Sequence, residues 1–252
     1  MLKVLVCGIG GKMGGNIVDL LKGDNEAQVA CGVDIHAPEG CKVPVYPSFS
    51  EVMERVDVII DFSSPAVLED ELKYAIANGV PAVLASTGYT AAQLEEIKAA
   101  AEQTAIFKTA NFSLGVNLLV GLVKKAAAVL GESFDIEIVE RHHNQKVDAP
   151  SGTALMLADA MNGVLEQKRQ YVEGRSGIVG KRGNEIGMHA VRGGTIVGEH
   201  EVMFAGEDEI ISLSHSARSK RVFAVGAIRA AKWMAGKPAG LYDMNDVLKD
   251  IL

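Results

Sequence analysis

Residues 2–34 read LKVLVCGIGGKMGGNIVDLLKGDNEAQVACGVD and contain four structural signals in succession. An apolar run over residues 3–7 predicts a buried β-strand, and a glycine-rich turn follows it. Residues 12–22 have apolar side chains at helical spacing, and a second apolar run over residues 28–34 ends in Asp34. A strand, a glycine turn, a helix and another strand form a βαβ unit, from which parallel sheets are built.

The same alternation continues to residue 109. Further strands are predicted over residues 56–62, 81–86 and 105–109, with helices over residues 65–78 and 91–103 between them. Strands that are apolar on both faces and separated by helices predict a parallel sheet with helices on both sides.

After Asn111 the pattern changes. It predicts helices over residues 114–130 and 151–169, a strand over 134–140, a Gly- and Arg-rich loop over 173–187, and strands over 187–192, 195–204 and 209–215. Gly193-Gly194 and residues 206–208 read as hairpin turns between the last three strands. A last helix over residues 221–234 is expected to return to the first domain.

The expected fold class is therefore α/β: a Rossmann-like parallel-sheet domain plus an α+β domain with an antiparallel or mixed sheet. We expect residues 1–113 with 222–252 to form a dinucleotide-binding domain. Residues 114–221 are expected to form a substrate-binding and oligomerisation domain.

Composition limits the partners of this 252-residue chain. Its net charge of −7 argues against binding to nucleic acid or to an anionic membrane. The longest apolar candidate for a membrane span, residues 118–130, is interrupted by Lys124 and Lys125. Three scattered cysteines without a CxxC pair give no disulfide scaffold, and the N-terminal apolar run is too short for a secretory signal. These features predict a cytoplasmic protein.

The glycine turn is the candidate dinucleotide site. Gly8, Gly11 and Gly14 follow a predicted strand and open a predicted helix, although the strict G-x-G-x-x-G pattern would need glycine where Met13 stands. Such a turn lets the backbone approach a pyrophosphate at the helix N-terminus, and Asp34 stands where an acid binds the ribose hydroxyls. The alternative is a plain turn with a surface Asp, and Lys12 can be either a phosphate ligand or a solvated lysine.

The acid at position 34 also bears on which cofactor is used. Asp34 would repel a 2′-phosphate, and Ile35 after it carries no positive charge. We therefore expect NADH to be used at least as well as NADPH.

Residues 140–154, ERHHNQKVDAPSGTA, hold the densest chemistry. Histidine and lysine can transfer protons, and the Ser-Gly-Thr that starts a helix can bind a carboxylate. The alternative is a capped helix with solvated charges. A metal site is not expected, because His142 and His143 are adjacent on a strand and point to opposite faces.

This segment resembles the signature of the dihydrodipicolinate reductase family, E-x-H-H-x-x-K-x-D-x-P-S-G-T-A. The resemblance covers nearly the whole chain. Its other matching segments are residues 8–14, 110–113, 115–117, 192–195 and 198–200.

The resemblance implies an NAD(P)H-dependent oxidoreductase of lysine and diaminopimelate biosynthesis. The implied reaction reduces 4-hydroxy-tetrahydrodipicolinate, a cyclic dicarboxylate, with loss of water, and family members are usually homotetramers. His142 and Lys146 are the implied catalytic residues. His143, Gly152 and Thr153 are implied to bind the substrate, and Ser151 joins them from its place at the helix start. The implied cofactor contacts are Gly8, Ile9, Gly10, Gly11, Lys12, Met13, Asp34, Ala85, Ser86, Thr87, Thr109, Ala110, Asn111 and Phe112.

Two other function classes fit parts of the sequence. One is an aspartate or homoserine type of dehydrogenase on the same scaffold, which the Lys146–Ala154 run opposes and amino-acid-dependent NAD reduction would support. The other is a non-enzymatic dinucleotide sensor, which should lack the His-His-x-x-Lys cluster and bind cofactor without turnover.

Overall fold

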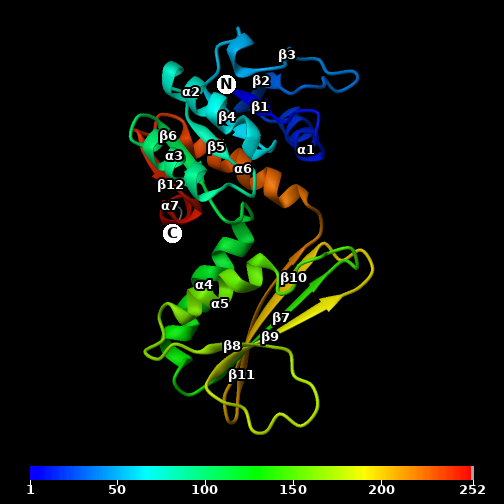
Figure 1. Cartoon of the computed structure of the whole chain (residues 1–252), viewed down its shortest axis with the longest axis vertical. Helices are drawn as coiled ribbons and strands as arrows, with labels where there is room; N and C mark the ends of the chain where they lie inside the picture. Colours follow the sequence, from blue (N-terminus) through cyan, green and yellow to red (C-terminus); the bar gives the residue numbers. More distant parts are fainter. Residues whose placement is uncertain (251–252) are drawn as a thin grey trace. The chain divides into compact units, whose positions relative to one another are not determined.

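The chain folds into two compact units in the computed structural model, which describes residues 1–250. The first unit consists of Met1–Ser113 and the chain from Arg221 onward, and the second is Leu114–Lys220. Figure 1 shows the elements of each unit, coloured along the sequence.

A seven-stranded parallel sheet forms the centre of the first unit. Its order is β12-β6-β5-β4-β1-β2-β3. The strands are β1 (Leu2–Cys7), β2 (Ala27–Val33), β3 (Val45–Tyr46), β4 (Val58–Asp61), β5 (Ala82–Leu84), β6 (Ala105–Lys108) and β12 (Gly240–Tyr242). The chain crosses from β3 back past β1 to β4, so the loops after β1 and β4 diverge at the carboxyl edge, where open α/β sheets bind ligands.

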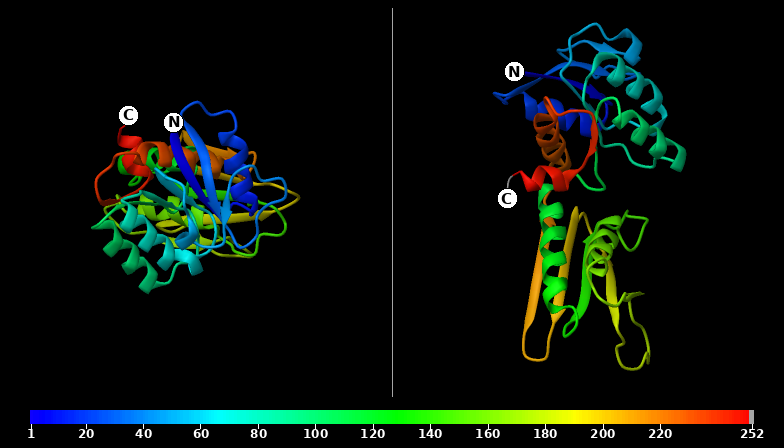
Figure 2. Two further views of the ribbon diagram at one scale, coloured as in Figure 1. Left: turned by 90° about the horizontal axis from the view of Figure 1, so that it is seen from above. Right: turned by 90° about the vertical axis from the view of Figure 1, so that its left-hand side faces the viewer.

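Helices cover both faces of this sheet (Figure 2). The helices are α1 (Lys12–Leu21), α2 (Leu68–Asn78), α3 (Ala91–Ala101), α6 (Arg221–Met234) and α7 (Met244–Lys249). Leu72 of α2 and Ile97 of α3 pack on one side of the strands, whereas α1 and α6 pack together on the other. The parallel sheet is confirmed, and α6 lies in the first unit.

Local sequence explains where these helices start and stop. Thr90 and Gln93 form a capping box at the start of α3. Gly79 ends α2 with a left-handed φ of 62°, a conformation that glycine adopts without strain. Ser64 caps the short 3-10 turn Pro65–Val67 that leads into α2.

The second unit is a five-stranded mixed sheet with two helices on one face. Its order is β11-β10-β7-β9-β8. The elements are α4 (Leu114–Leu130), β7 (Asp135–His142), α5 (Gly152–Asn162), β8 (Gln170–Glu173), β9 (Glu185–Arg192), β10 (Gly198–Ala205) and β11 (Ile210–Ala217). Buried side chains alternate along β7, with Ile136 and Ile138 beneath α4 and α5. The expected fold class is confirmed.

Three details of the second unit differ from expectation, and the first is strand β8 (Gln170–Glu173), which was not predicted from the sequence. The helix predicted over residues 151–169 ends at Asn162, because the Asn162 side chain bonds the backbone N–H and C=O of Arg169 and closes a loop instead. The Gly193-Gly194 turn does not join a hairpin. Strands β9 and β10 both pair with β7, which lies between them and runs parallel to β9.

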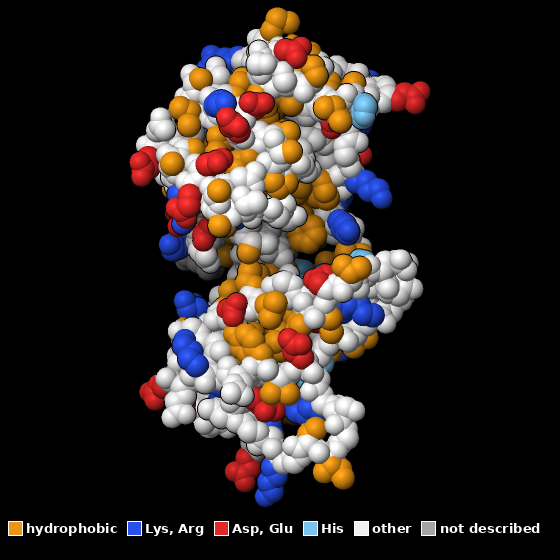
Figure 3. Space-filling view, viewed as in Figure 1, with side chains coloured by type: hydrophobic (Ala, Val, Ile, Leu, Met, Phe, Trp, Pro, Cys, Tyr) orange, Lys and Arg blue, Asp and Glu red, His pale blue; other side chains and the backbone are white. Residues whose placement is uncertain are grey.

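Hydrophobic side chains also lie on the outer surface of the second unit. Leu118 and Leu122 of α4 and Leu155 of α5 are each more than a third exposed. Figure 3 shows hydrophobic side chains gathered over these two helices. Among the described residues no helix is long and apolar enough to cross a membrane.

Candidate active site

The candidate cofactor residues gather at one edge of the parallel sheet. Residues 8–13 follow β1, Asp34 follows β2, residues 85–87 follow β5, and residues 109–112 follow β6. The strands are parallel, so their carboxyl ends meet at the same edge. This is the edge at which open α/β sheets bind dinucleotides.

The glycine turn leaves no room for side chains. Gly8 has a φ of +78°, and its N–H donates to Val33 O (2.9 Å). A Cβ on Gly10 would lie 2.8 Å from the carbonyl oxygen of His36. A Cβ on Gly14 would overlap the backbone of Gly8 and Ile9. The turn is therefore closed by backbone contacts that only glycine permits.

The residues between these glycines differ in exposure. Ile9 is buried and its side chain fills the space above Gly32, so only its backbone is available to a ligand. Lys12 is exposed, and Met13 is half-buried. Gly11 stands at the N-cap of α1 without a side-chain cap. The first N–H groups of a helix have no acceptor within the helix, so this end offers donors to an anion.

Asp34 ties the second strand to the glycine turn. Its Oδ2 accepts from Gly10 N–H (2.9 Å) and its Oδ1 accepts from His36 N–H (3.1 Å). A cavity of about 480 Å³ extends from Gly10 and Gly11 along α1 to Lys22 and the start of β2, and residues 38–43 line its other side. The N–H groups at the start of α1 and the acid that follows β2 fit the pyrophosphate and ribose of a dinucleotide.

The other two candidate segments are held by local hydrogen bonds. Ala85 N–H donates to Asp61 O (2.8 Å), Ser86 Oγ donates to Asp61 Oδ2 (2.7 Å), and Thr87 is exposed. In the segment after β6, Ala110 is exposed. The hydroxyl of Thr109 donates to Asn111 O (3.3 Å), and the Asn111 side chain accepts from Ser113 N–H. Phe112 is buried against Phe62 and Phe107.

In the second unit, Glu140 organises the candidate catalytic cluster. Glu140 and His142 lie on the buried face of β7, and Glu140 is only 1% exposed. Glu140 Oε2 lies 2.5 Å from His142 Nδ1, and Oε1 accepts from Ser151 N–H (3.1 Å). One carboxylate thus holds both the histidine ring and the start of α5.

Arg192 supplies the counter-charge for this buried carboxylate. Its two terminal nitrogens donate to the two oxygens of Glu140 (both 2.8 Å), and one also donates to Asp148 O (2.7 Å). Burial by itself would raise the pKa of Glu140, but the hydrogen bonds from Arg192 and His142 outweigh it and hold the pKa below its usual range. Glu140 is therefore ionised at neutral pH.

A second histidine, His200, packs against His142. His200 of β10 packs edge-on against His142, with 5.1 Å between the ring centroids, and its Nε2 lies 2.9 Å from Ser151 Oγ. Burial and then the charge of His142 lower the pKa of His200 to about 4. His200 is therefore neutral, so its Nε2 can accept from the hydroxyl that also caps α5 by accepting from Ala154 N–H.

Lys146 is already paired. Its Nζ donates to both oxygens of Asp148 (2.7 and 2.9 Å), and its side chain is 19% exposed. The hydrogen bond from Lys146 lowers the pKa of Asp148. His143 is half-buried just before Lys146, Gly152 is exposed, and Thr153 is half-buried in the first turn of α5.

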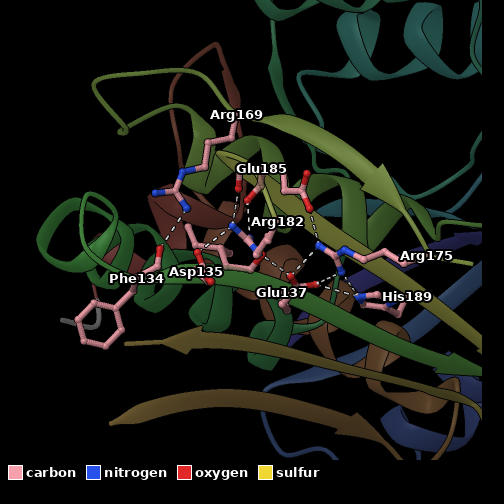
Figure 4. Close-up of polar contacts among 10 residues, drawn as sticks. Phe134, Asp135, Glu137, Arg169, Arg175, Arg182, Glu185 and His189 are labelled. Atoms are coloured by element: carbon pink, nitrogen blue, oxygen red, sulfur yellow. Dashed lines mark hydrogen bonds and ion pairs between the residues drawn. The ribbon is translucent and has the colours of Figure 1, made fainter. Parts of the chain in front are cut away.

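The loop between β8 and β9 lies at the other end of the sheet. Arg175 and Arg182 point from it toward Glu137, which also bonds His189 (Figure 4). Glu137 precedes His142 by five residues on β7, which is roughly 16 Å along a strand. Within the second unit this loop is fixed to the sheet and does not cover His142.

Four residues that the structure places in these clusters had no role predicted from the sequence. They are Asp61, Glu140, Arg192 and His200. Only Glu140 could have been found from the local sequence, because it stands two residues before His142 and residues two apart on a strand share a face. Among the described residues, no group of three or more His, Cys, Asp or Glu side chains is arranged to hold a metal ion.

Known protein families and relatives match this chain over nearly its whole length. Residues 2–112 match the family described as dihydrodipicolinate reductase, N-terminus, and residues 115–248 match its C-terminus. A 4-hydroxy-tetrahydrodipicolinate reductase of Caldanaerobacter subterraneus subsp. tengcongensis is 50% identical over 250 residues, and one of Clostridium novyi is 45% identical over 249. Each of these alignments covers 99% of both chains. The dipicolinate-bound dihydrodipicolinate reductase from Paenisporosarcina sp. TG-14 has a similar structure, with a TM-score of 0.83, 25% identity and full coverage of both chains.

Proposed function

Because the chain belongs to the dihydrodipicolinate reductase family, as its sequence predicted, we propose that it reduces 4-hydroxy-tetrahydrodipicolinate with NAD(P)H. The product is tetrahydrodipicolinate, formed with loss of water in lysine and diaminopimelate biosynthesis. One observation carries the proposal. Glu140 holds His142 and the Ser151 end of α5 together, and Lys146 stands beside them on the same segment.

The second unit supplies the groups that a cyclic dicarboxylate needs. One substrate carboxylate would bind the N–H groups at Ser151-Gly152-Thr153, where the helix end favours an anion. His143 would contact the substrate next to them. Lys146 can exchange Asp148 for a substrate carboxylate, because Asp148 is a half-exposed partner that water can solvate once it is released.

The reaction also needs a proton donor. The bound nicotinamide supplies a hydride to the substrate ring, and an acid then protonates the neighbouring carbon. Lys146 and His142 are the two candidates, and the geometry supports a different part for each. Lys146 carries transferable protons in a partly open position, whereas His142 is 8% exposed and is held by Glu140.

The first unit would hold the cofactor with Gly8–Met13, Asp34, Ala85–Thr87 and Thr109–Phe112. The uncapped start of α1 and the closed glycine turn support this assignment. Asp34 places negative charge at the ribose end, which disfavours a 2′-phosphate. NADH is therefore proposed to serve at least as well as NADPH.

We further propose a homotetramer of cytoplasmic location without nucleic-acid or membrane partners. The second unit leaves one sheet face uncovered by helices, and its edge strand β11 is largely exposed. Open strand edges and exposed apolar side chains favour self-association. The proposed chemistry needs no metal, because the cofactor supplies the hydride and a side chain the proton.

A coupled assay tests the reaction. The substrate is generated in place from pyruvate and aspartate semialdehyde by the preceding synthase, and oxidation of NADH and of NADPH is followed separately. Oxidation that depends on the synthase is expected with both cofactors. A folded protein that binds NADH but never oxidises it would refute the substrate. A kcat/KM for NADPH more than about tenfold above that for NADH would refute the cofactor preference.

A further inference from the structure

A buried carboxyl group lies beneath the candidate cofactor edge of the first unit. Asp61 is the last residue of β4, is fully buried, and pairs in register with Cys7 of β1 and Leu84 of β5. The two neighbouring strands end one residue before Gly8 and before Ala85. Asp61 therefore lies where the glycine turn and the residue 85–87 segment both begin.

Three donors from two loops point at this carboxyl group. Asp61 Oδ1 accepts from the backbone N–H of Ser63 (2.8 Å) and from the Ser63 hydroxyl. Asp61 Oδ2 accepts from the hydroxyl of Ser86 (2.7 Å). The side chain thus links the loop after β4 to the loop after β5.

Ser63 also contacts the glycine turn directly. A Cβ added to Gly8 would lie 3.0 Å from both Cα and N of Ser63, so the two backbones are in close contact. The Cys7 thiol also donates to Ser63 Oγ (3.4 Å). A shift of Ser63 would therefore move the turn that is expected to hold the pyrophosphate.

The environment of Asp61 is unusual for a group with only a structural role. No lysine, arginine or histidine of the described residues forms an ion pair with it. Glu71 of α2 lies in the same interior, also fully buried, and neither of its oxygens has a hydrogen-bond partner among the described residues. Burial, and then the proximity of Asp61, raise the pKa of Glu71 well above its usual range. Burial raises the pKa of Asp61 as well, against the opposing hydrogen bonds from Ser63 and Ser86.

We propose that Asp61 is a positioning residue for the nicotinamide cofactor, because its carboxyl group fixes Ser63 against the glycine turn and Ser86 at the end of β5. The inference rests on the proposed function only in its choice of cofactor. Asp61 itself touches no ligand in this scheme and acts through the two serine loops.

NADH binding to the whole protein, followed by the fluorescence of the bound nicotinamide, tests the proposal. Asp61→Ala should raise the dissociation constant of NADH by about tenfold or more, because both loops lose their anchor. Asp61→Asn should stay within about threefold of the wild type, because its amide can accept from Ser63 and donate to Ser86 Oγ. In the coupled assay the KM for NADH should rise with Asp61→Ala while the KM for the substrate stays unchanged.

Glu71→Ala is the matched control, since it removes a buried carboxyl from the same interior without touching either serine. It should leave NADH affinity within about twofold of the wild type even if it lowers the melting temperature. Equal losses of affinity in Glu71→Ala and Asp61→Ala would overturn the proposal, as would a folded Asp61→Ala variant with normal affinity.

If Asp61→Ala does not fold, the double variant Ser63→Ala/Ser86→Ala removes the same hydroxyl contacts, and unchanged NADH affinity in it would equally overturn the proposal. The titration needs no substrate. An error in the proposed substrate therefore shows only in the coupled assay, while an error about Asp61 shows in the binding constants.

Discussion

His142 Nδ1 lies 2.5 Å from Glu140 Oε2, and the two residues stand two apart on the buried face of β7. An ionised carboxylate at this distance requires a proton on Nδ1, so Glu140 sets both the tautomer and the direction of the ring. Arg192 balances the charge of Glu140 through two hydrogen bonds. His142 is thus oriented by a carboxylate that is itself fixed from β9.

Replacing Glu140 by Gln should lower kcat. Each oxygen of Glu140 pairs with two donors and the amide nitrogen of Gln accepts none, so two of the donors from Arg192, His142 and Ser151 would be left without an acceptor. We expect a decrease of about tenfold or more in kcat, measured in the coupled assay. Glu137→Gln is the control on the same strand, and its kcat should remain within about twofold. Comparable losses in both variants would assign the effect to the strand and not to His142.

Lys146→Ala should reduce kcat by about a hundredfold or more, because a positioned acid contributes roughly 10²–10⁴ to a rate. Lys146→Arg keeps the charge near Asp148 but gives up the proton much less readily. It should therefore recover substrate KM more than kcat. A folded Lys146→Ala variant with nearly normal kcat would leave His142 as the remaining candidate for the proton donor.

The stability of the protein should depend on His200 between pH 6.5 and 4. The pKa of His200 is lowered to about 4 in the fold, mainly by burial, while the unfolded chain takes up the proton near 6.5. Stability is therefore complete above pH 6.5 and is lost as the pH falls. This single group should cost about 2 kcal/mol between pH 7 and 5.

Thermal melts of the wild type and of His200→Gln at several pH values measure this dependence. His215, whose pKa burial also lowers, contributes with the same sign in both proteins and cancels in the comparison. If the melting temperatures of the two proteins fell by the same amount between pH 7 and 5, a neutral, buried His200 would be contradicted.

The loop after β8 should be released when Glu137 is lost. Arg175 and Arg182 of this loop both donate hydrogen bonds to Glu137. Trypsin cleaves after arginine, so these contacts should protect both sites while the loop is fixed. Glu137→Ala should be cleaved in this loop at least about fivefold faster than the wild type, because local opening governs proteolysis. Limited trypsin digestion with mass spectrometry measures the rate.

Glu207→Ala is the control for that experiment. Glu207 is an exposed residue of the turn between β10 and β11 and makes no ion pair among the described residues. Its loss should not change cleavage after Arg175 or Arg182. Equal cleavage of the wild type and Glu137→Ala would mean that the ion pairs do not hold the loop.

The sequence predicted what depends on neighbouring residues. Alternating apolar runs predicted five of the seven strands of the first unit, with bounds right to within about two residues because periodicity is local. The short strands β3 and β12 were not predicted. The helix predicted over residues 163–169 and the hairpin predicted at Gly193-Gly194 were wrong. There, the Asn162 contacts with Arg169 and the insertion of β7 between β9 and β10 decide the structure.

The sequence by itself determined the family, the fold class and the contiguous motifs, because residues 8–14 and 140–154 each place their functional groups on one strand, turn and helix start. Only the tertiary structure decided which distant residues join them. Arg192 and His200 reach Glu140 and Ser151 from 49 to 52 positions away, and Ser86 reaches Asp61 from 25. Strand order and register bring these pairs together, and a pattern along the chain does not encode which strands become neighbours.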